Sequence, residues 1–161
     1  MAQTGTSQSL MHGKKGLIMG VANDRSIAWA IAAKLAEHGA QLAFTFQGDA
    51  LQKRVTPLAA SVGSDLVMPC DVTDEASMDL VFSKLEQQWG KIDFVLHAIA
   101  YSDKEELKGG YVDTTRSNFQ RTMDISVYSF TAIARRAATI MNDSGSMLTL
   151  TYYGAERVMP H

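Results

Sequence analysis

Two adjacent tyrosines, Tyr152 and Tyr153, follow the apolar segment SMLTLT near the end of the 161-residue sequence. A tyrosine hydroxyl can donate a hydrogen bond to negative charge that develops on a substrate oxygen, so such residues are candidates for the rim of an active site. A catalytic hydroxyl normally works with a base or a second donor. No such partner follows the pair before His161. The remaining chemistry must therefore be sought elsewhere.

A second candidate is the segment GVANDRSIAWAIA, which begins where the apolar run GLIMG at 16–20 ends. In an open parallel sheet, ligands bind beyond the carboxyl ends of the strands, and the first N–H groups of a following helix can hold a pyrophosphate. Only Gly20 stands where the motif G-x-G-x-x-G supplies three glycines, with Ser26 and Ala28 in its later part. The segment is consistent with a dinucleotide-binding turn and equally with an ordinary strand-to-helix turn.

Polar side chains follow the next two apolar runs. Gln47 follows QLAFTF, at the place where NAD-binding sheets carry a carboxylate for the adenosine ribose and NADP-binding proteins carry an arginine for the 2′-phosphate. An amide can hydrogen-bond the ribose or adenine, but it offers no cation. After LVMP, Asp71 could accept from an adenine amino group while Val72 covers the ring. A solvated turn at Gln47 and simple helix capping at Asp71 remain open alternatives.

The fourth apolar run, DFVLHAIA at 93–100, carries small residues at its end. Ala98 and Ala100 would let a flat cofactor approach the backbone, with Ile99 against its adenosine ribose. His97 is expected to be a hydrogen-bonded core residue. The arginines of the long helical stretch that follows, which include Arg136, are expected to form a solvated helix face.

Composition excludes several classes of protein. A hydrophobic share of 46%, a charged share of 20% and a net charge of -2 are typical of globular domains and give no basic field for nucleic acid. No apolar run approaches the roughly 20 residues needed to span a bilayer. The four histidines show no metal-ligand spacing, so no metal is expected. The single cysteine, Cys70, cannot form an internal disulfide and is expected to be a small buried residue, which favours a cytoplasmic location.

Short apolar runs alternate with segments of helical periodicity, which is typical of βαβ units. The fold class expected is α/β, a Rossmann-like doubly wound parallel sheet with helices on both faces. A mobile arm is expected over residues 1–13 and a dinucleotide-binding domain over 14–161. Strands are predicted at 16–20, 41–46, 66–69, 93–100 and 146–151. Helices are predicted from an N-cap at Ser26 to Gly39, at 50–62, at 74–89 and, with an internal break, at 115–141.

Taken in order, these segments resemble the NADH-dependent enoyl-acyl-carrier-protein reductases of bacterial type II fatty-acid synthesis, a divergent branch of the short-chain dehydrogenases/reductases. The resemblance runs from Gly13 to His161. It is carried by GVANDRSIAWAIA, LAFTFQ and CDVTDEAS, and above all by DISVYSF and LTLTYYGAERVMP.

The resemblance implies roles for individual residues. It implies NADH contacts for Gly20, Ser26, Ile27, Gln47, Asp71, Val72 and Ile99. It places Ser102 beside the acyl substrate, and Tyr152 as an accessory residue where ordinary short-chain dehydrogenases carry a catalytic serine. The family's second tyrosine and its lysine would lie just past His161, so the sheet is expected to be incomplete at its C-terminus.

The resemblance also implies an acyl carrier protein bearing the enoyl substrate as partner, and a homotetramer. Two alternatives remain. An ordinary short-chain ketoreductase or alcohol dehydrogenase would need a serine at Tyr152 and usually NAG in place of HAIA. A non-catalytic dinucleotide-binding module would fit a chain without the second tyrosine and the lysine.

Overall fold

Five strands alternate with helices in a computed structural model that describes residues 9–158. The strands are β1 Lys15–Met19, β2 Gln41–Phe46, β3 Val67–Pro69, β4 Ile92–His97 and β5 Met141–Thr149. The α-helices are α1 Ile27–Glu37, α2 Gly48–Ser61, α3 Glu75–Trp89, α4 Arg116–Met123 and α5 Ser129–Ile140, with the π-helix η3 Asp124–Tyr128 between the last two. The short 3-10 helices are η1 Lys104–Leu107, η2 Tyr111–Asp113 and η4 Tyr153–Ala155.

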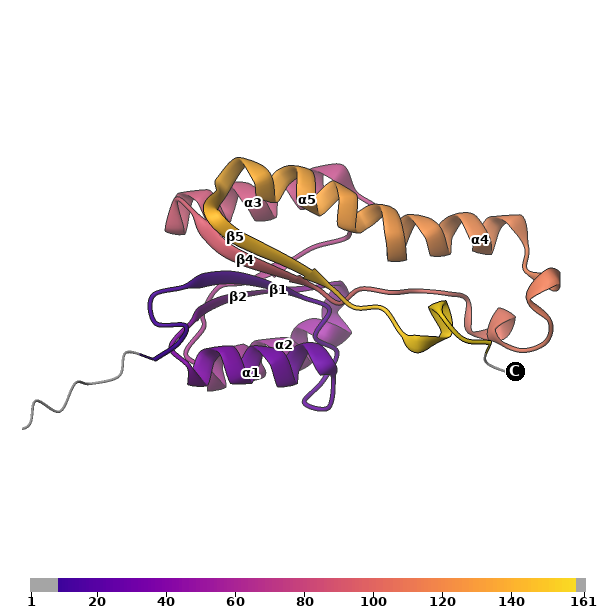
Figure 1. Cartoon of the computed structure of the whole chain (residues 1–161), viewed down its shortest axis with the longest axis horizontal. Coiled ribbons are helices and arrows are strands. Elements are labelled where there is room, and N and C mark those ends of the chain that lie inside the picture. The colour runs from indigo at the N-terminus through magenta and orange to yellow at the C-terminus, as the bar shows by residue number, and fades with distance from the viewer. Residues whose placement is uncertain (1–8, 159–161) are drawn as a thin grey trace, which may run out of the picture.

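All five strands are parallel and lie in the order β3-β2-β1-β4-β5. Figure 1 shows the sheet between two layers of helices. The chain begins in the middle of the sheet, adds β2 and β3 on one side, and then crosses to add β4 and β5 on the other. This is the doubly wound arrangement, and the strand order reverses between β1 and β4. The predicted α/β, Rossmann-like fold class is confirmed.

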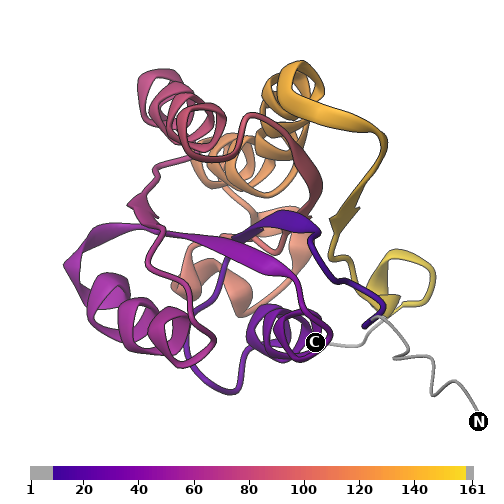
Figure 2. The same cartoon turned by 90° about the vertical axis from the view of Figure 1, so that its left-hand side faces the viewer.

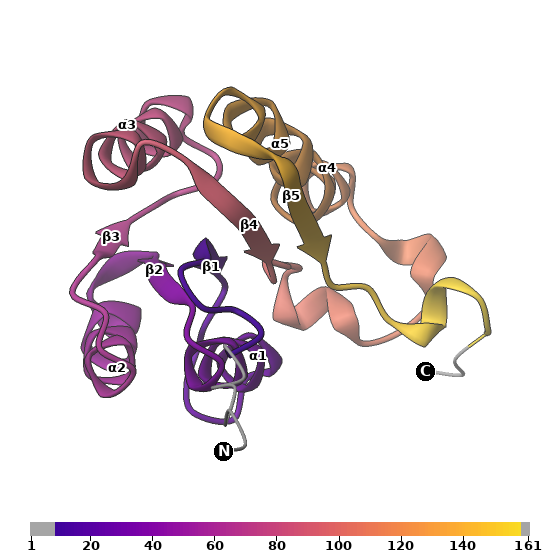
Figure 3. The same cartoon turned by 60° about the vertical axis from the view of Figure 1, so that its left-hand side comes forward.

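Helices cover both faces of the sheet: α1 and α2 lie on one face, and α3 and α5 on the other (Figure 2, Figure 3). Side chains along a strand alternate between faces, and the core follows that alternation. Leu17 and Met19 of β1 belong to the core under α3 and α5, whereas Ile18 belongs to the core under α1 and α2. The near-continuous apolar runs of β1, β2 and β4 are thus strands buried on both sides, whereas β5 is largely exposed.

The two largest differences from the predicted strand boundaries are at the end of the fourth strand and the start of the fifth. The strand predicted over 93–100 ends at His97, and Ala98 to Ala100 leave the sheet to line a cavity. The fifth strand begins at Met141 rather than Ser146, directly after α5. The break expected within 115–141 is η3, a π-helical insertion between α4 and α5. Such insertions often occur at functional sites.

The predicted arm, residues 1–13, is only partly described, because residues 1–8 lie outside the described part of the chain. In the remainder, the Met11 amide donates to the His38 carbonyl oxygen at 2.9 Å, and the Met11 side chain packs against the core under α1. Within residues 9–158, no helix is both long and apolar enough to cross a membrane.

Candidate functional site

A cavity of about 230 Å³ lies at the carboxyl ends of β1 to β4. It occupies the point where the strand order reverses, which is where open α/β sheets bind ligands. Five of the seven residues predicted to contact NADH line it: Gly20, Gln47, Asp71, Val72 and Ile99. They come from the turns after four different strands, so the fold brings together residues up to 79 positions apart in the sequence.

Gly20 directly follows β1 and allows a close approach of two chain segments. Its φ is +94°, and a Cβ added there would collide with the Ala98 carbonyl oxygen. The Ala98 amide in turn donates to the Met19 carbonyl oxygen at 3.0 Å. Any side chain at position 20 would therefore meet both backbone strain and a backbone atom that cannot move freely. A single glycine suffices for this turn.

Gln47 and Asp71 contact each other across the ends of β2 and β3. The Gln47 Nε2 donates to Asp71 Oδ2 at 2.9 Å, while the Thr73 amide and hydroxyl donate to Asp71 Oδ1 at 2.9 and 2.7 Å. The hydrogen bonds from Thr73 and Gln47 together lower the pKa of Asp71, the Thr73 amide contributing most. Asp71 thus carries its negative charge at neutral pH, at the edge of the cavity.

The rest of the cavity is mainly apolar. Val72 and Ile99 line it together with the small residues Ala98 and Ala100, as the sequence suggested. Ile125 also lines it, and it comes from η3, far along the chain. Sequence reasoning missed Ile125; the only signal was its place in the segment DISVYSF. Mainly apolar walls with two polar groups at one end suit a nucleotide base and ribose.

Ser26 and Ile27 are not among the residues that line the cavity. Ser26 is the N-cap residue of α1, as predicted, but its hydroxyl donates to the Asn23 carbonyl oxygen at 2.7 Å and does not cap the first turn. The first N–H groups of α1 are thus left without a side-chain cap from Ser26. Unpaired N–H groups at a helix N-terminus can bind a phosphate.

Ser102 lies in the loop after β4, which packs on the start of α4. Its hydroxyl accepts from Asn118 Nδ2 at 3.1 Å, and the buried Asn118 also accepts from the Asp103 amide at 2.9 Å. The Tyr101 amide donates to Ser126 Oγ at 3.0 Å. Ser102 is therefore held in place beside the cavity-lining Tyr101 without lining the cavity itself.

His97 is fully buried at the end of β4, and the structure identifies its neutral tautomer. Ser129 Oγ donates to the Ile125 carbonyl oxygen at 2.6 Å, so it accepts from His97 Nε2 at 2.8 Å. Nδ1 then accepts from the Thr149 hydroxyl at 3.2 Å. Burial lowers the pKa of His97. As expected, this histidine is a hydrogen-bonded core residue, and it joins β4 to β5 and to the first residue of α5.

The paired tyrosines lie at the surface after β5. Tyr152 is 80% exposed and Tyr153 is 61% exposed, and neither lines the cavity. Tyr153 carries the Arg157 guanidinium over its ring at 5.6 Å. Cys70 is buried, as predicted, and burial raises the pKa of its thiol to about 11, so it is not a nucleophile at neutral pH. Among residues 9–158, no group of three metal-ligating side chains is present.

The fold and the cavity define an α/β domain of Rossmann type with a ligand-sized cavity at the reversal of strand order. The sequence profile of the family described as "Enoyl-(Acyl carrier protein) reductase" matches residues 20–161, and the chain belongs to this family. It is 68% identical over 155 residues to "Enoyl-[acyl-carrier-protein] reductase [NADH] 1" of Rhizobium meliloti, a match that covers 96% of this chain and 57% of that protein.

Solved structures agree with this assignment. A crystal structure of FabI from Candidatus Liberibacter asiaticus is 55% identical with a TM-score of 0.92, and the match covers 94% of this chain and 59% of that one. The reductase of Anaplasma phagocytophilum, solved in complex with NAD, is 54% identical with a TM-score of 0.91, with 96% and 59% covered. The chain thus spans less than two thirds of the length of these relatives.

Proposed function

We propose that this chain binds NADH in the cavity at the carboxyl end of the sheet and forms the cofactor-binding part of an enoyl-acyl-carrier-protein reductase. One observation carries the proposal: five residues chosen from the sequence as NADH contacts line a single cavity at the reversal of strand order. Family membership and the NAD complex of a relative support the choice of ligand.

The residues present fit such a cofactor. Asp71 and Gln47 offer an acceptor and an amide at one end of the cavity for the adenine and its ribose. Val72 and Ile99 provide apolar surface for the base. The first turn of α1 begins after Ser26, at Ile27, and Ser26 provides no side-chain cap for it. It follows the carboxyl end of β1, where its free N–H groups would hold the pyrophosphate.

The reaction proposed is conjugate reduction of a trans-2-enoyl thioester. When bound, NADH supplies the hydride that adds to the β-carbon of the substrate. Within this chain, the resemblance places Ser102 beside the acyl substrate and makes Tyr152 an accessory residue. By the resemblance, a second tyrosine donates to the developing oxyanion and a lysine holds the nicotinamide ribose. These 161 residues do not include that tyrosine or that lysine.

We propose as partners an acyl carrier protein bearing the enoyl group and further copies of the chain in a homotetramer, in the cytoplasm. Self-association is supported by an exposed apolar row on α4 and η3. Phe119, Met123 and Val127 recur every four residues and are 45%, 41% and 52% exposed. Residues spaced in this way share one helix face, and such exposed rows often mark interfaces. The reduced, buried Cys70 is consistent with a cytoplasmic location.

Cofactor binding tests the proposal directly. In the full-length protein encoded by the source gene, NADH is expected to bind with a Kd that rises about threefold to tenfold in Gln47→Ala, because both the contact and the support of Asp71 are lost. Gln87→Ala removes an exposed amide from α3 and serves as the matched control. Isothermal titration gives both constants. Absence of NADH binding, or equal effects of the two variants, would reject the proposal.

Reduction of crotonyl thioester, followed by NADH absorbance, tests the reaction itself. Turnover with an enoyl thioester, and none with a 3-ketoacyl thioester, is expected. The opposite preference would favour an ordinary short-chain ketoreductase.

A further inference from the structure

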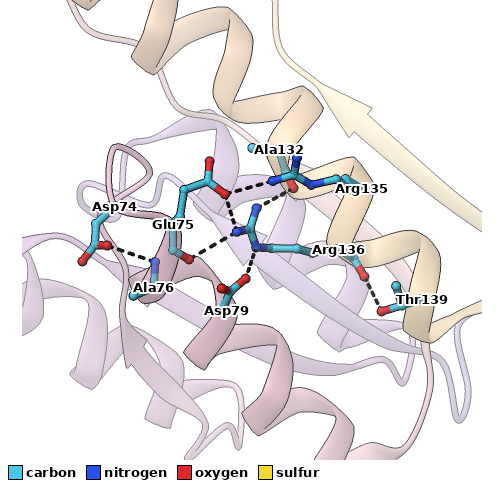
Figure 4. Close-up of polar contacts among 8 residues, drawn as sticks. All are labelled: Asp74, Glu75, Ala76, Asp79, Ala132, Arg135, Arg136 and Thr139. Atoms are coloured by element: carbon cyan, nitrogen blue, oxygen red, sulfur yellow. Dashed lines mark hydrogen bonds and ion pairs between the residues drawn. The ribbon is translucent and has the colours of Figure 1, made fainter.

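Arg136 stands out among the charged residues of the described chain because its side chain is largely shielded from solvent and almost fully paired. The sequence favoured a solvated helix face for this residue, and that interpretation was wrong: its side chain is 10% exposed, whereas that of the adjacent Arg135 is 62% exposed. Arg136 lies on α5 and faces the first turn of α3 (Figure 4). A buried arginine needs partners for its charge and its five N–H donors.

Four hydrogen bonds supply those partners. Arg136 Nη2 donates to Glu75 Oε2 at 2.6 Å and to the Glu75 carbonyl oxygen at 3.2 Å, and Nε donates to Asp79 Oδ1 at 2.7 Å (Figure 4). Nη1 donates to the Ala132 carbonyl oxygen of its own helix at 3.1 Å. The planar guanidinium therefore fixes both the side chain and the backbone of Glu75, the first residue of α3.

The first turns of α3 also hold the turn that faces the adenine end of the cavity. The Asp71 amide donates to Ser77 Oγ at 2.9 Å, and the Asp74 amide donates to the Asp71 carbonyl oxygen at 3.1 Å. Asp74 is the N-cap of α3 and accepts from the Ala76 amide at 3.0 Å. The path from α5 to Asp71 thus consists of the polar contacts of Arg136 with Glu75, the backbone of α3 from Glu75 to Ser77, and the hydrogen bond between Ser77 and the Asp71 amide.

We propose that Arg136 is a positioning residue for the adenine-facing turn, residues 71–74, and that it sets affinity for the adenine half of the cofactor. The proposal rests on NADH binding as proposed above. Arg136 does not line the cavity, and the acceptors of its hydrogen bonds, Glu75, Asp79 and Ala132, do not line it either. It acts by fixing the start of α3, so that Asp71 is already in place when the ligand arrives. Preorganised groups bind more tightly because less motion is lost on binding.

Two arginines on one helix give a matched pair of variants. Arg136→Met removes the buried guanidinium and keeps an apolar stem of similar length. Arg135→Met removes a guanidinium that pairs with the same Glu75 carboxylate. This guanidinium belongs to a largely exposed side chain. In the full-length protein, Arg136→Met is expected to raise the Kd for NADH about threefold to tenfold, in the range of couplings through contact networks. Arg135→Met is expected to leave it within twofold, as for most exposed ion pairs.

A comparison of ligands separates positioning from a general loss of structure. ADP probes the adenine half, and reduced nicotinamide mononucleotide probes the other half. Arg136→Met should raise the Kd for NADH and the Kd for ADP by the same factor and leave the Kd for the mononucleotide unchanged. Arg136→Lys keeps the positive charge but lacks the planar guanidinium and its several N–H donors, so it should recover only part of the affinity. In a Ser77→Ala background the effect of Arg136→Met should shrink, because the contact path is already broken.

Amide hydrogen exchange provides a readout that needs no ligand. The Asp71 and Thr73 amides should exchange faster in Arg136→Met than in Arg135→Met. Unchanged ADP affinity in Arg136→Met, or equal changes in both arginine variants, would overturn the inference. If the parent protein binds neither NADH nor ADP, the proposed function fails, and the exchange rates of these two amides alone then decide whether Arg136 positions the turn.

Discussion

Gln47 Nε2 lies 2.9 Å from Asp71 Oδ2, so a single hydrogen bond ties the turn after β2 to the turn after β3. Both residues are candidates for the adenosine end of the cofactor, and each supports the other. Asp71 accepts at both of its oxygens, from Gln47 on one side and from Thr73 on the other. The carboxylate is therefore held in one orientation, and its charge is kept at the edge of the cavity.

The first prediction is a preference for NADH over NADPH in the full-length protein. Gln47 offers no cation to a 2′-phosphate, and the ionised Asp71 next to it would repel one. We expect NADH to bind at least about tenfold more tightly, and Asp71→Asn to reduce that ratio. Titrations with both cofactors at one ionic strength measure this. Tighter binding of NADPH would show that the roles given to Gln47 and Asp71 are wrong.

The second prediction concerns Gly20. Gly20→Ala should lower the free energy of unfolding by about 3 kcal/mol or more, since it adds a clash with the Ala98 carbonyl oxygen to the strain of a positive φ. Gly63→Ala is the matched control: its φ is +76°, but nothing lies within 4 Å of the added Cβ. That variant should cost only about 1 to 2 kcal/mol. Urea unfolding of both variants would test the difference, and equal losses would contradict the close approach at Gly20.

The third prediction is a pH dependence that originates at His97. Burial lowers its pKa in the folded protein below the unfolded value of about 6.5, so folding favours the neutral ring. Its contribution to stability is fully present above about pH 6.5 and is lost as the pH falls towards the folded pKa. The slope that this one group adds can reach about 1.4 kcal/mol per pH unit.

His97→Asn keeps polar atoms near Ser129 and Thr149 but removes the titrating group. Between pH 7.5 and 5.5, the free energy of unfolding of the variant should fall less steeply than that of the parent. Urea titrations at several pH values in this range provide the comparison. If the free energy of unfolding falls with pH equally in the variant and the parent, titration of His97 does not cause the loss of stability at acid pH.

Strand order and site could be read from the sequence to different extents. Gly20, Gln47, Asp71 and Ile99 follow successive strands, and a doubly wound sheet necessarily brings such residues to one edge. Their place in the cavity was therefore predictable once the strands were found. Ile125 was not, because its position depends on the π-helical insertion η3, which leaves no periodic signal.

Arg136 shows a second limit of sequence reasoning. It adjoins Arg135 in the sequence, and helical periodicity alone places both arginines near one polar side of α5. Which of the two is buried depends on where Glu75 and Asp79 of α3 lie, some 60 residues earlier in the chain. The packing of the two helices decides this.

The last prediction concerns turnover and the role of Tyr152. Tyr152 is 80% exposed and lies outside the cavity lining, and the resemblance makes it accessory to a donor tyrosine beyond these 161 residues. Positioning and charge stabilisation supply most of the rate of such reactions. A polypeptide ending at His161 is therefore expected to show no measurable reduction of an enoyl thioester, although it would retain weak affinity for NADH if it folds. A chain extended to the length of its relatives is expected to be active.

In that extended chain, Tyr152→Phe should leave substantial turnover, whereas loss of the downstream tyrosine's hydroxyl should cost on the order of a hundredfold or more, as for a principal oxyanion donor. NADH absorbance with crotonyl and longer enoyl thioesters measures both rates, after mass spectrometry has verified where each chain ends. Tyr153→Phe is the matched control, since Tyr153 is also exposed and packs with Arg157. Robust turnover by the verified short chain would instead assign the oxyanion contact to Tyr152 or Tyr153, because these 161 residues would then contain the whole catalytic apparatus.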